Sequence, residues 1–497
     1  MIGILAAGLA SFAIVTQDQI PLRAAPSENA ARHAVLTQGD NLEVRGAKGD
    51  YLQVYDHRRE RAGYVRIAQA GLYGLTPEEA PRLRAVLEFL KDQPGQEALG
   101  IGHAAAFLKA APAEAIDAGA FEALGTMAER LAWRASRLTA ADNEKSRIVS
   151  AHLEAAASYG VKFYSVERHE KVSLCYDGDA WRHLLALPST PGQKARAALA
   201  LTRHDCIAPT PSPAEQLDAD RRRAEILEDA LADGVKRGDL PAHVENRIKL
   251  RAAGVWASLA HRLAQRLDSD PAAVFDAGQK AESHLAGVDK NAFTDGDRAA
   301  WNEAAVRVGA SRWAALPQTL AQPAPGRPGI RLAASEKPGQ TCVRIVAAQT
   351  PAARGQRPAA AAAPVEPFTQ CTYGKVWPSS LTVSPDGKAM TLAVQPLGDW
   401  RELWVFQQEQ GVWRLDIVPP SVDAPELGYV EFAGWVPGNK QFLVARETIA
   451  NGRSKTSFEL WDRATLKVER SADKPGNLSA FYRWQDAAWK SGTVAVR

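Results

Sequence analysis

The stretch LEVRGAKGDYLQVY, residues 42–55, decides how the front of the chain folds. Four aliphatic residues in it alternate with other residue types: Leu42, Val44, Leu52 and Val54. This period of two is typical of a half-buried strand, whose successive side chains point to opposite faces. The glycines within residues 46–50 can adopt the positive φ angles that a hairpin turn requires. The stretch therefore predicts two antiparallel strands that place these four side chains in a core.

Three more short apolar runs flank this hairpin, at residues 13–16, 34–36 and 63–67. Five strands this short and this closely spaced favour a small barrel. The segments PLRAAPS, LTQGDNLEV, GDYLQVYD and GYV have an order and spacing that resemble those of bacterial SH3-like (SH3b) domains over residues 12–69. The resemblance implies an SH3-like β-barrel, which we place at residues 12–70. It also implies a targeting or binding module of cell-envelope proteins, sometimes for peptidoglycan.

Three tyrosines of this segment are candidate binding residues: Tyr51, Tyr55 and Tyr64. The alternation places Tyr51 and Tyr55 on the face opposite the core, where an exposed pair could stack on a sugar or a peptide. Tyrosine is amphipathic, so it also suits a surface that a neighbouring domain covers. Both interpretations of the pair remain open at the level of sequence.

The length and the charge of the chain limit the number of domains and the kinds of partner to be expected. A chain of 497 residues exceeds one ordinary core, and two to four domains are expected. Its 60 basic and 57 acidic residues are mixed along the chain, which argues against a nucleic-acid partner. Residues 1–11 are apolar and rich in small side chains, and they predict either the end of a secretory signal or merely an apolar N-terminus. Neither this segment nor any other approaches the ~20 apolar residues of a membrane span.

The four cysteines fall into two local pairs. An even number of locally paired cysteines fits disulfides formed in an oxidising compartment, here the periplasm or the cell exterior. We expect bonds from Cys175 to Cys206 and from Cys342 to Cys371, with four free thiols as the alternative. A zinc set of Cys175, His183, His204 and Cys206 is less favoured, because its spacing matches no known finger.

Residues 73–320 predict an all-α domain. Helix-start signals recur at residues 76–79, 190–193 and 212–215, where Thr or Ser is followed by Pro and then by Glu or Gln. Apolar residues follow at helical spacing, and about ten helices are expected. Several starts have similar spacing, which suggests stacked helical hairpins in the manner of a tetratricopeptide-like solenoid. An irregular bundle is the alternative, since no repeat consensus is present.

The last third of the chain predicts β structure. Residues 321–369 form a Pro/Ala-rich linker with one strand near 341–346, and residues 370–497 form an antiparallel β domain. Two four-stranded units, one with the turn SPDGK and one with PGNK, resemble β-propeller blades over residues 378–497. A third unit of two strands is expected from Leu478 onward. The resemblance implies a partial propeller, and a β-sandwich of the same strands is the alternative.

No catalytic signature is present in the chain: it has no Gly-x-Ser-x-Gly elbow, phosphate loop, His-Glu-x-x-His helix or Cys-x-x-Cys pair. The leading hypothesis is therefore a non-enzymatic, exported bacterial envelope protein, without cofactor or metal. It would act as a binding or scaffold module, and its expected partner is peptidoglycan or an envelope protein. The alternative is a cell-wall hydrolase, or another envelope enzyme, with a site between domains.

Overall fold

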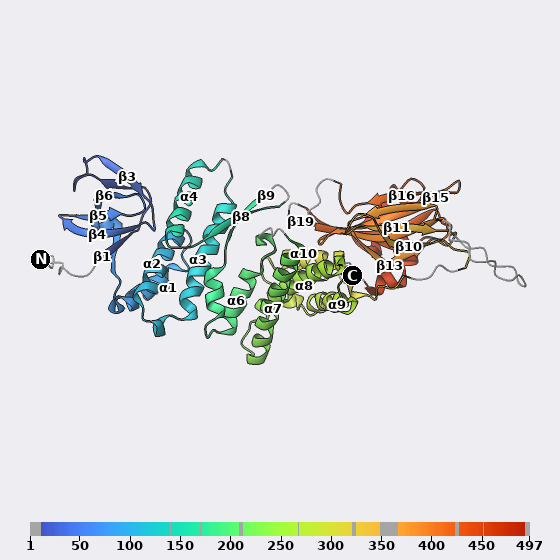
Figure 1. Cartoon of the computed structure of the whole chain (residues 1–497), viewed down its shortest axis with the longest axis horizontal. Coiled ribbons are helices and arrows are strands. Elements are labelled where there is room, and N and C mark those ends of the chain that lie inside the picture. The colour runs from blue at the N-terminus through green and yellow to red at the C-terminus, as the bar shows by residue number, and fades with distance from the viewer. Residues whose placement is uncertain are drawn as a thin grey trace, which may run out of the picture. The chain divides into compact units, whose positions relative to one another are not determined.

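The computed structural model divides the chain into two compact units, residues 1–209 and 210–497 (Figure 1). The signal-like segment lies outside the described residues, except Ser11, and so do residues 321–324 and 348–365 of the expected linker. The residues described are 11–139, 141–168, 171–207, 212–266, 268–320, 325–347, 366–422, 427–450 and 452–492. The helical region expected at residues 73–320 is shared between the units, and each unit combines helices with its own sheets.

The first unit begins with a seven-stranded antiparallel sheet in the order β3-β2-β6-β5-β4-β1-β7. Its strands are β1 (Ser11–Val15), β2 (Ile20–Arg23), β3 (Arg32–Leu36), β4 (Asn41–Lys48), β5 (Tyr51–Asp56), β6 (Arg61–Arg66) and β7 (Ala70–Gly74). The predicted hairpin is β4 and β5, where Val44 pairs with Val54. Leu42, Leu52 and Val54 are buried, and Val44 packs half-buried against the same cluster.

The sheet has seven strands, two more than the five predicted from the sequence. The strands β2 and β7 were missed because both contain turn-forming residues, Pro21 in β2 and two glycines in β7. The residue pairs of β7 lie along β1, so this sheet extends to Gly74, past the predicted end at residue 70.

Among the described residues of the first unit, six α-helices follow: α1 (Ala80–Leu90), α2 (Glu97–Ala110), α3 (Ala118–Ser136), α4 (Asn143–Ser158), α5 (Asp179–Leu185) and α6 (Pro191–Leu201). A two-stranded hairpin, β8 (Phe163–Arg168) and β9 (Lys171–Tyr176), interrupts them, so the all-α prediction is wrong for this part. Val172, Leu174 and Tyr176 alternate with small residues, which is a strand pattern. Cys175 on β9 is disulfide-bonded to Cys206, the last residue of a short 3-10 turn after α6.

The sheet and the helices of the first unit share a core. Ile14 of β1 belongs to the hydrophobic cluster of the helices. Gly39, at φ +90°, lies so close to Ala98 that a Cβ would sit 2.7 Å from the Ala98 carbonyl oxygen. The Tyr159 hydroxyl of the segment after α4 donates to the Gly39 carbonyl at 2.7 Å. The front sheet and the helices that follow it in the chain therefore pack together as one folded unit.

Asp18 ties the loop between β1 and β2 to α4. One of its carboxylate oxygens accepts from the Thr37 hydroxyl at 2.7 Å, from the Gln38 N–H at 3.1 Å and from His152 Nε2 at 2.8 Å. Burial alone would raise the pKa of Asp18, but the hydrogen bonds from His152, Thr37 and Gln38 outweigh it and lower this pKa to about 2. The native state thus favours the ionised form of Asp18.

We expect Asp18→Asn to reduce the free energy of unfolding of the first unit by about 2 kcal/mol at pH 7. The folded pKa lies below the unfolded value of 3.8, so this stabilisation is present above pH 4 and is lost as the pH falls towards 2. Denaturant titrations at pH 7 and pH 2.5 measure it, with the exposed Asp92→Asn as the matched control. An effect of Asp18→Asn that is equal at both pH values would contradict the assignment.

The second unit begins with four helices, α7 (Pro213–Arg237), α8 (Ala242–Gln265), α9 (Pro271–Ala286) and α10 (Asp297–Ser311), and a 3-10 turn at Arg312–Ala315. Of the three helix-start signals predicted from sequence, Ser212 and, in the first unit, Thr190 form capping boxes, in which side chains satisfy otherwise unpaired N–H groups. The third, at Thr76, precedes a 3-10 turn and makes no side-chain capping bond. The described chain has ten α-helices between residues 80 and 311, the number expected.

The strands of the second unit form a small sheet and a large one. The small sheet is β10 (Gly329–Ala334), β11 (Thr341–Val346) and β12 (Phe368–Thr372), so the predicted linker holds two strands and part of a third. Cys342 and Cys371 face each other on β11 and β12 and are disulfide-bonded. The large sheet comprises β13 (Lys375–Val383), β14 (Ala389–Leu397), β15 (Trp400–Glu409), β16 (Val412–Val418), β17 (Leu427–Trp435), β18 (Gln441–Ala450), β19 (Arg453–Asp462) and β20 (Val468–Ala472).

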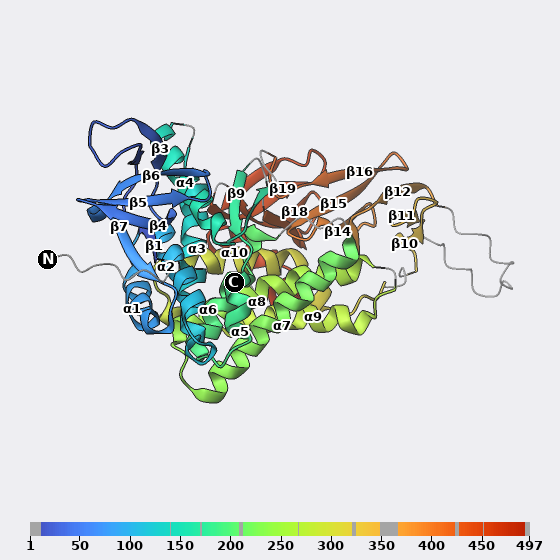
Figure 2. The same ribbon diagram turned by 60° about the vertical axis from the view of Figure 1, so that its left-hand side comes forward.

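The large sheet consists of the two predicted four-stranded units, β13–β16 and β17–β20, and each is antiparallel throughout. A short parallel pairing joins them, Trp400 with Gly428 and Arg401 with Tyr429. The small sheet packs against the first four-stranded unit through Ile330 and Val343. Figures 1 and 2 show the helices of this unit along one side of the large sheet, where α10 shares a core with β17–β19.

The third β unit expected from Leu478 is wrong. The described residues after Leu478, which end at residue 492, include two short helices, α11 (Ser479–Trp484) and α12 (Ala487–Gly492). Their aromatic residues Phe481 and Trp489 pack edge-to-face on Phe458 of β19. Aromatic residues are enriched in strands, so the local sequence favours a strand here. In the structure these side chains lie on short helices and pack against the sheet.

Candidate functional site

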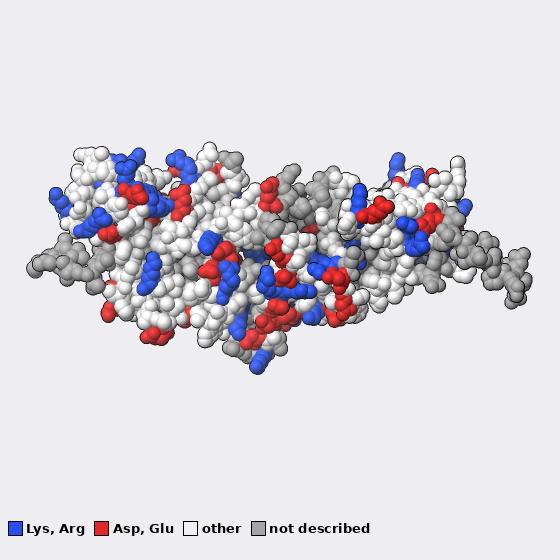
Figure 3. Space-filling model, viewed as in Figure 1, with Lys and Arg blue, Asp and Glu red and all other residues white. Residues whose placement is uncertain are grey.

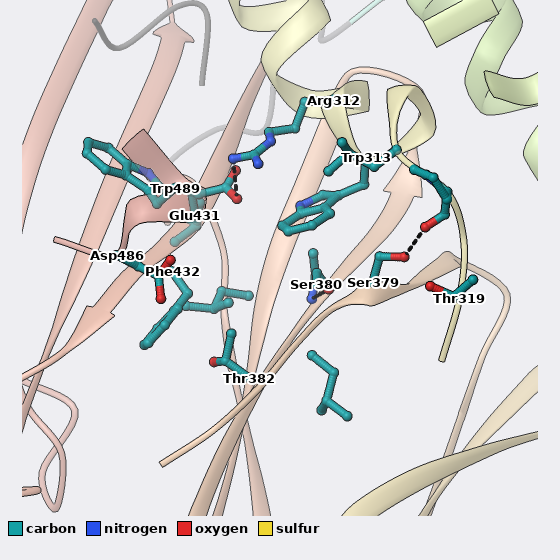
Figure 4. Close-up of a pocket in the computed structure, with 16 residues that line it drawn as sticks. Arg312, Trp313, Thr319, Ser379, Ser380, Thr382, Glu431, Phe432, Asp486 and Trp489 are labelled. Carbon is teal, nitrogen blue, oxygen red and sulfur yellow. Dashed lines mark hydrogen bonds and ion pairs between the residues drawn. The ribbon is translucent and has the colours of Figure 1, made fainter. Parts of the chain in front are cut away.

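A pocket of about 580 Å³ lies on one face of the large sheet in the second unit (Figure 4). Its walls come from the 3-10 turn after α10 and the residues that follow it, from β13, from β17, and from the α12 region. Ala393 and Leu403, which are paired across β14 and β15, also line it. All of these elements belong to one compact unit.

The β13 wall is shaped by an irregularity in the strand. The pairing of β13 with β14 shifts between Trp377 and Thr382, across a Pro-Ser-Ser sequence. Proline cannot donate a ladder hydrogen bond, and bulges of this kind redirect side chains. The Ser379 hydroxyl donates to the Pro317 carbonyl at 2.5 Å, which fastens β13 to the segment after the 3-10 turn. The Ser380 hydroxyl accepts from the Ala393 N–H at 2.7 Å and so replaces part of the lost ladder.

A cluster of ion pairs, formed by Arg312, Arg401 and Glu431, lies at the wall of the pocket opposite β13. Arg312 donates to one oxygen of Glu431 at 2.9 Å, and Arg401 donates to the other oxygen. All three side chains are buried, and Arg401 has no exposed surface. Burial lowers the pKa of Arg401, although the neighbouring Glu431 opposes that shift. Both Glu431 oxygens are therefore engaged by guanidinium groups, which fixes the carboxylate as a structural group.

Aromatic faces and hydroxyls supply the rest of the lining. The Arg312 guanidinium lies 4.5 Å from the centroid of the Trp313 ring and orients that indole. Figure 4 shows Trp313 projecting towards Ser380 and Thr382, with Phe432 and Trp489 on the other side of the space. No histidine, cysteine or lysine occurs among the described residues that line this pocket. Such a lining suits a ligand that offers both an apolar face and hydrogen-bonding groups.

The three tyrosines predicted as binding residues lie in the first unit. Tyr51 and Tyr55 point to one face of β5, and Tyr64 pairs with Gln53 between them, so the three share a face. Tyr51 is only 7% exposed, so the expected exposed pair is wrong at this position. Tyr55 is half-buried, with the Arg45 guanidinium 4.2 Å from its ring centroid. Long basic side chains cover this face, which an alternation pattern does not reveal.

The residues of the second-unit pocket were not singled out from the sequence. Two signals were available: a proline within the apolar run before Leu381, and the single carboxylate Glu431 within the otherwise apolar and glycine-containing strand β17. The partners of Glu431 lie 119 and 30 positions away, so no local pattern could join them.

Charge on the visible face of the molecule is interspersed, with basic and acidic side chains alternating over both units (Figure 3). Within the described ranges, no group of three or more His, Cys, Asp or Glu side chains is placed to hold a metal ion. Across the same residues, none of the helices is both long and apolar enough to cross a bilayer. Comparison of the chain with protein-family models, with curated proteins and with solved structures finds no match.

Proposed function

We propose that this chain is an exported bacterial cell-envelope protein, periplasmic or secreted, that binds peptidoglycan fragments in the pocket of its second unit. The two disulfides support an oxidising compartment, because such bonds persist there and are rare in the cytosol. On this proposal the front sheet is an SH3b-like barrel that contributes to targeting. The two four-stranded units are propeller-like blades that carry the pocket.

The observation that carries the proposal is the combination of side chains around the pocket. Trp313 and Phe432 offer ring faces on which the apolar side of an amino sugar can stack. Thr319, Ser379 and Thr382 line the same space and bear hydroxyls. Peptidoglycan presents pyranose rings, amides and hydroxyls together, which matches this mixture of apolar and polar groups.

The alternative function, a cell-wall hydrolase, rests on two carboxylates that line the same pocket, Glu431 and Asp486. Paired carboxylates are the usual catalytic groups of glycoside hydrolysis. Binding is favoured over hydrolysis because both oxygens of Glu431 accept from arginines. Loss of turbidity from a peptidoglycan suspension, abolished by Asp486→Asn, would establish the hydrolase in place of the binding protein.

We expect Trp313→Ala to weaken co-sedimentation of the full chain with isolated peptidoglycan by more than tenfold. Truncating an aromatic anchor at the centre of a site typically costs about 2 kcal/mol or more of binding free energy. The matched control is Trp133→Ala, because Trp133 is 50% exposed on α3 of the first unit and lines no part of this pocket. Absence of binding by the unaltered chain, or an equal loss in both variants, would overturn the proposal.

A further inference from the structure

A second pocket of about 650 Å³ lies in the second unit. It is formed by the end of α8, the start of α9, the residues after the 3-10 turn, and the first residues of β13. Its lining is mostly apolar and includes Leu263, Val274, Phe275 and Trp377. The volume falls within the range of sites that bind small organic ligands.

Two cationic side chains line this pocket, and they differ in their surroundings. Arg266 is paired with Asp268, at 2.7 Å, on the exposed loop after α8. Lys375, the first residue of β13, has no ion pair and no side-chain hydrogen bond to any other described residue. Its ammonium group lies 5.6 Å from the centroid of the Trp377 ring. Lys375 is thus the cation of this pocket whose charge is not neutralised within the described chain.

The surroundings of Lys375 disfavour its charged form. Burial lowers the pKa of Lys375, and no neighbouring carboxylate opposes that shift. The nearest partner by register is Gln395, whose amide is already engaged by Trp377 Nε1 at 3.0 Å and by the Gly398 carbonyl at 2.9 Å. Ammonium groups removed from water are rarely left without a counter-charge.

We propose that this second pocket binds a small amphipathic carboxylate, with the acid group paired to Lys375 and the hydrocarbon part among Leu263, Val274 and Phe275. The ligand supplies the counter-charge that the described chain lacks, and the apolar walls take the chain or ring that follows it. This site is distinct in chemistry from the first pocket, which contains no lysine in its lining. It therefore adds a second ligand class and does not depend on peptidoglycan binding.

The test uses octanoate and octanol, which share a hydrocarbon chain and differ in charge. Titration of the full chain, followed by calorimetry, is expected to show octanoate binding about tenfold more tightly than octanol, the gain typical of a charge-assisted contact. Lys375→Met should abolish this preference and leave octanol binding in place. The matched control is Lys280→Met, because Lys280 also lies over a tryptophan ring, that of Trp256, but on an exposed position of α9.

Each result decides for or against the proposal. Equal affinity for the two compounds, no binding of either, or an unchanged preference in Lys375→Met would overturn it. Loss of the preference in Lys280→Met would also overturn it, because that lysine does not line the pocket. Thermal unfolding provides the check on folding: Lys375→Met should melt no lower than the unaltered chain, since it removes an unpaired, half-buried charge.

Discussion

Replacing Glu431 with glutamine is expected to lower the free energy of unfolding of the second unit by about 3–5 kcal/mol. Glu431 is the carboxylate that Arg312 and Arg401 share, and all three side chains are buried. Glutamine keeps the shape of the side chain and one acceptor oxygen, but it leaves two guanidinium groups without their counter-charge. A buried charge that loses its partner cannot recover its hydration, and this accounts for the size of the effect.

The matched control is Glu303→Gln in the same unit. Glu303 also pairs with an arginine, Arg307, at 3.0 Å, but its side chain is 44% exposed. Exposed pairs of this kind contribute about 0–1 kcal/mol, so this variant should unfold nearly as the unaltered chain does. Denaturant unfolding followed by tryptophan fluorescence suits the comparison, because eleven of the thirteen tryptophans lie beyond residue 209. A loss below 1 kcal/mol for Glu431→Gln would contradict the buried cluster.

Removing each disulfide is expected to lower the free energy of unfolding of its own unit by about 3.5 kcal/mol. The bonds close loops of 31 and 29 residues, and a loop of this size restricts the unfolded chain by about that amount. The double variant Cys175→Ala with Cys206→Ala should destabilise the first unit, and Cys342→Ala with Cys371→Ala should destabilise the second. Because the two bonds lie in different units, each pair serves as the control for the other.

Mass spectrometry of non-reduced peptides provides the chemical check on this prediction. Protein recovered from the cell envelope should yield linked peptides for Cys175–Cys206 and Cys342–Cys371 and no crossed pair. Four free thiols in that protein would contradict both bonds and, with them, the argument for export.

The alternation within residues 42–55 was sufficient to predict the β4–β5 hairpin, because side-chain burial in a strand follows directly from its period of two. It did not reveal that Tyr51 is buried, since that burial comes from side chains such as Arg66, whose guanidinium lies 5.5 Å from the Tyr51 ring centroid. Strand β7 escaped prediction because two of its five residues are glycines, and its strand conformation depends on pairing with β1, about sixty positions away. The local sequence indicates which face of a sheet a side chain can occupy, but it does not indicate which other side chains cover that face.

The cysteine pairs were predictable because the partners lie only 31 and 29 positions apart, so that pairing within each local pair was favoured over crossed pairing. The helices after Leu478 were not, because their aromatic content matches that of a strand and only docking on Phe458 decides the outcome. The pocket of the second unit could not be predicted either, because it too depends on contacts between distant segments. Trp313, Ser379 and Glu431 come from segments that meet only when the large sheet and the helix end have packed.

Hydrogen–deuterium exchange of the full chain, with and without soluble fragments released from isolated peptidoglycan, tests the central claim most directly. Ligand in the pocket should slow exchange in three separate segments of the second unit, residues 312–319, 379–382 and 430–432, because all three line it. The Trp313→Ala variant should lose this protection. Protection confined to residues 11–74, or none at saturating fragment concentration, would contradict a peptidoglycan site in the second unit.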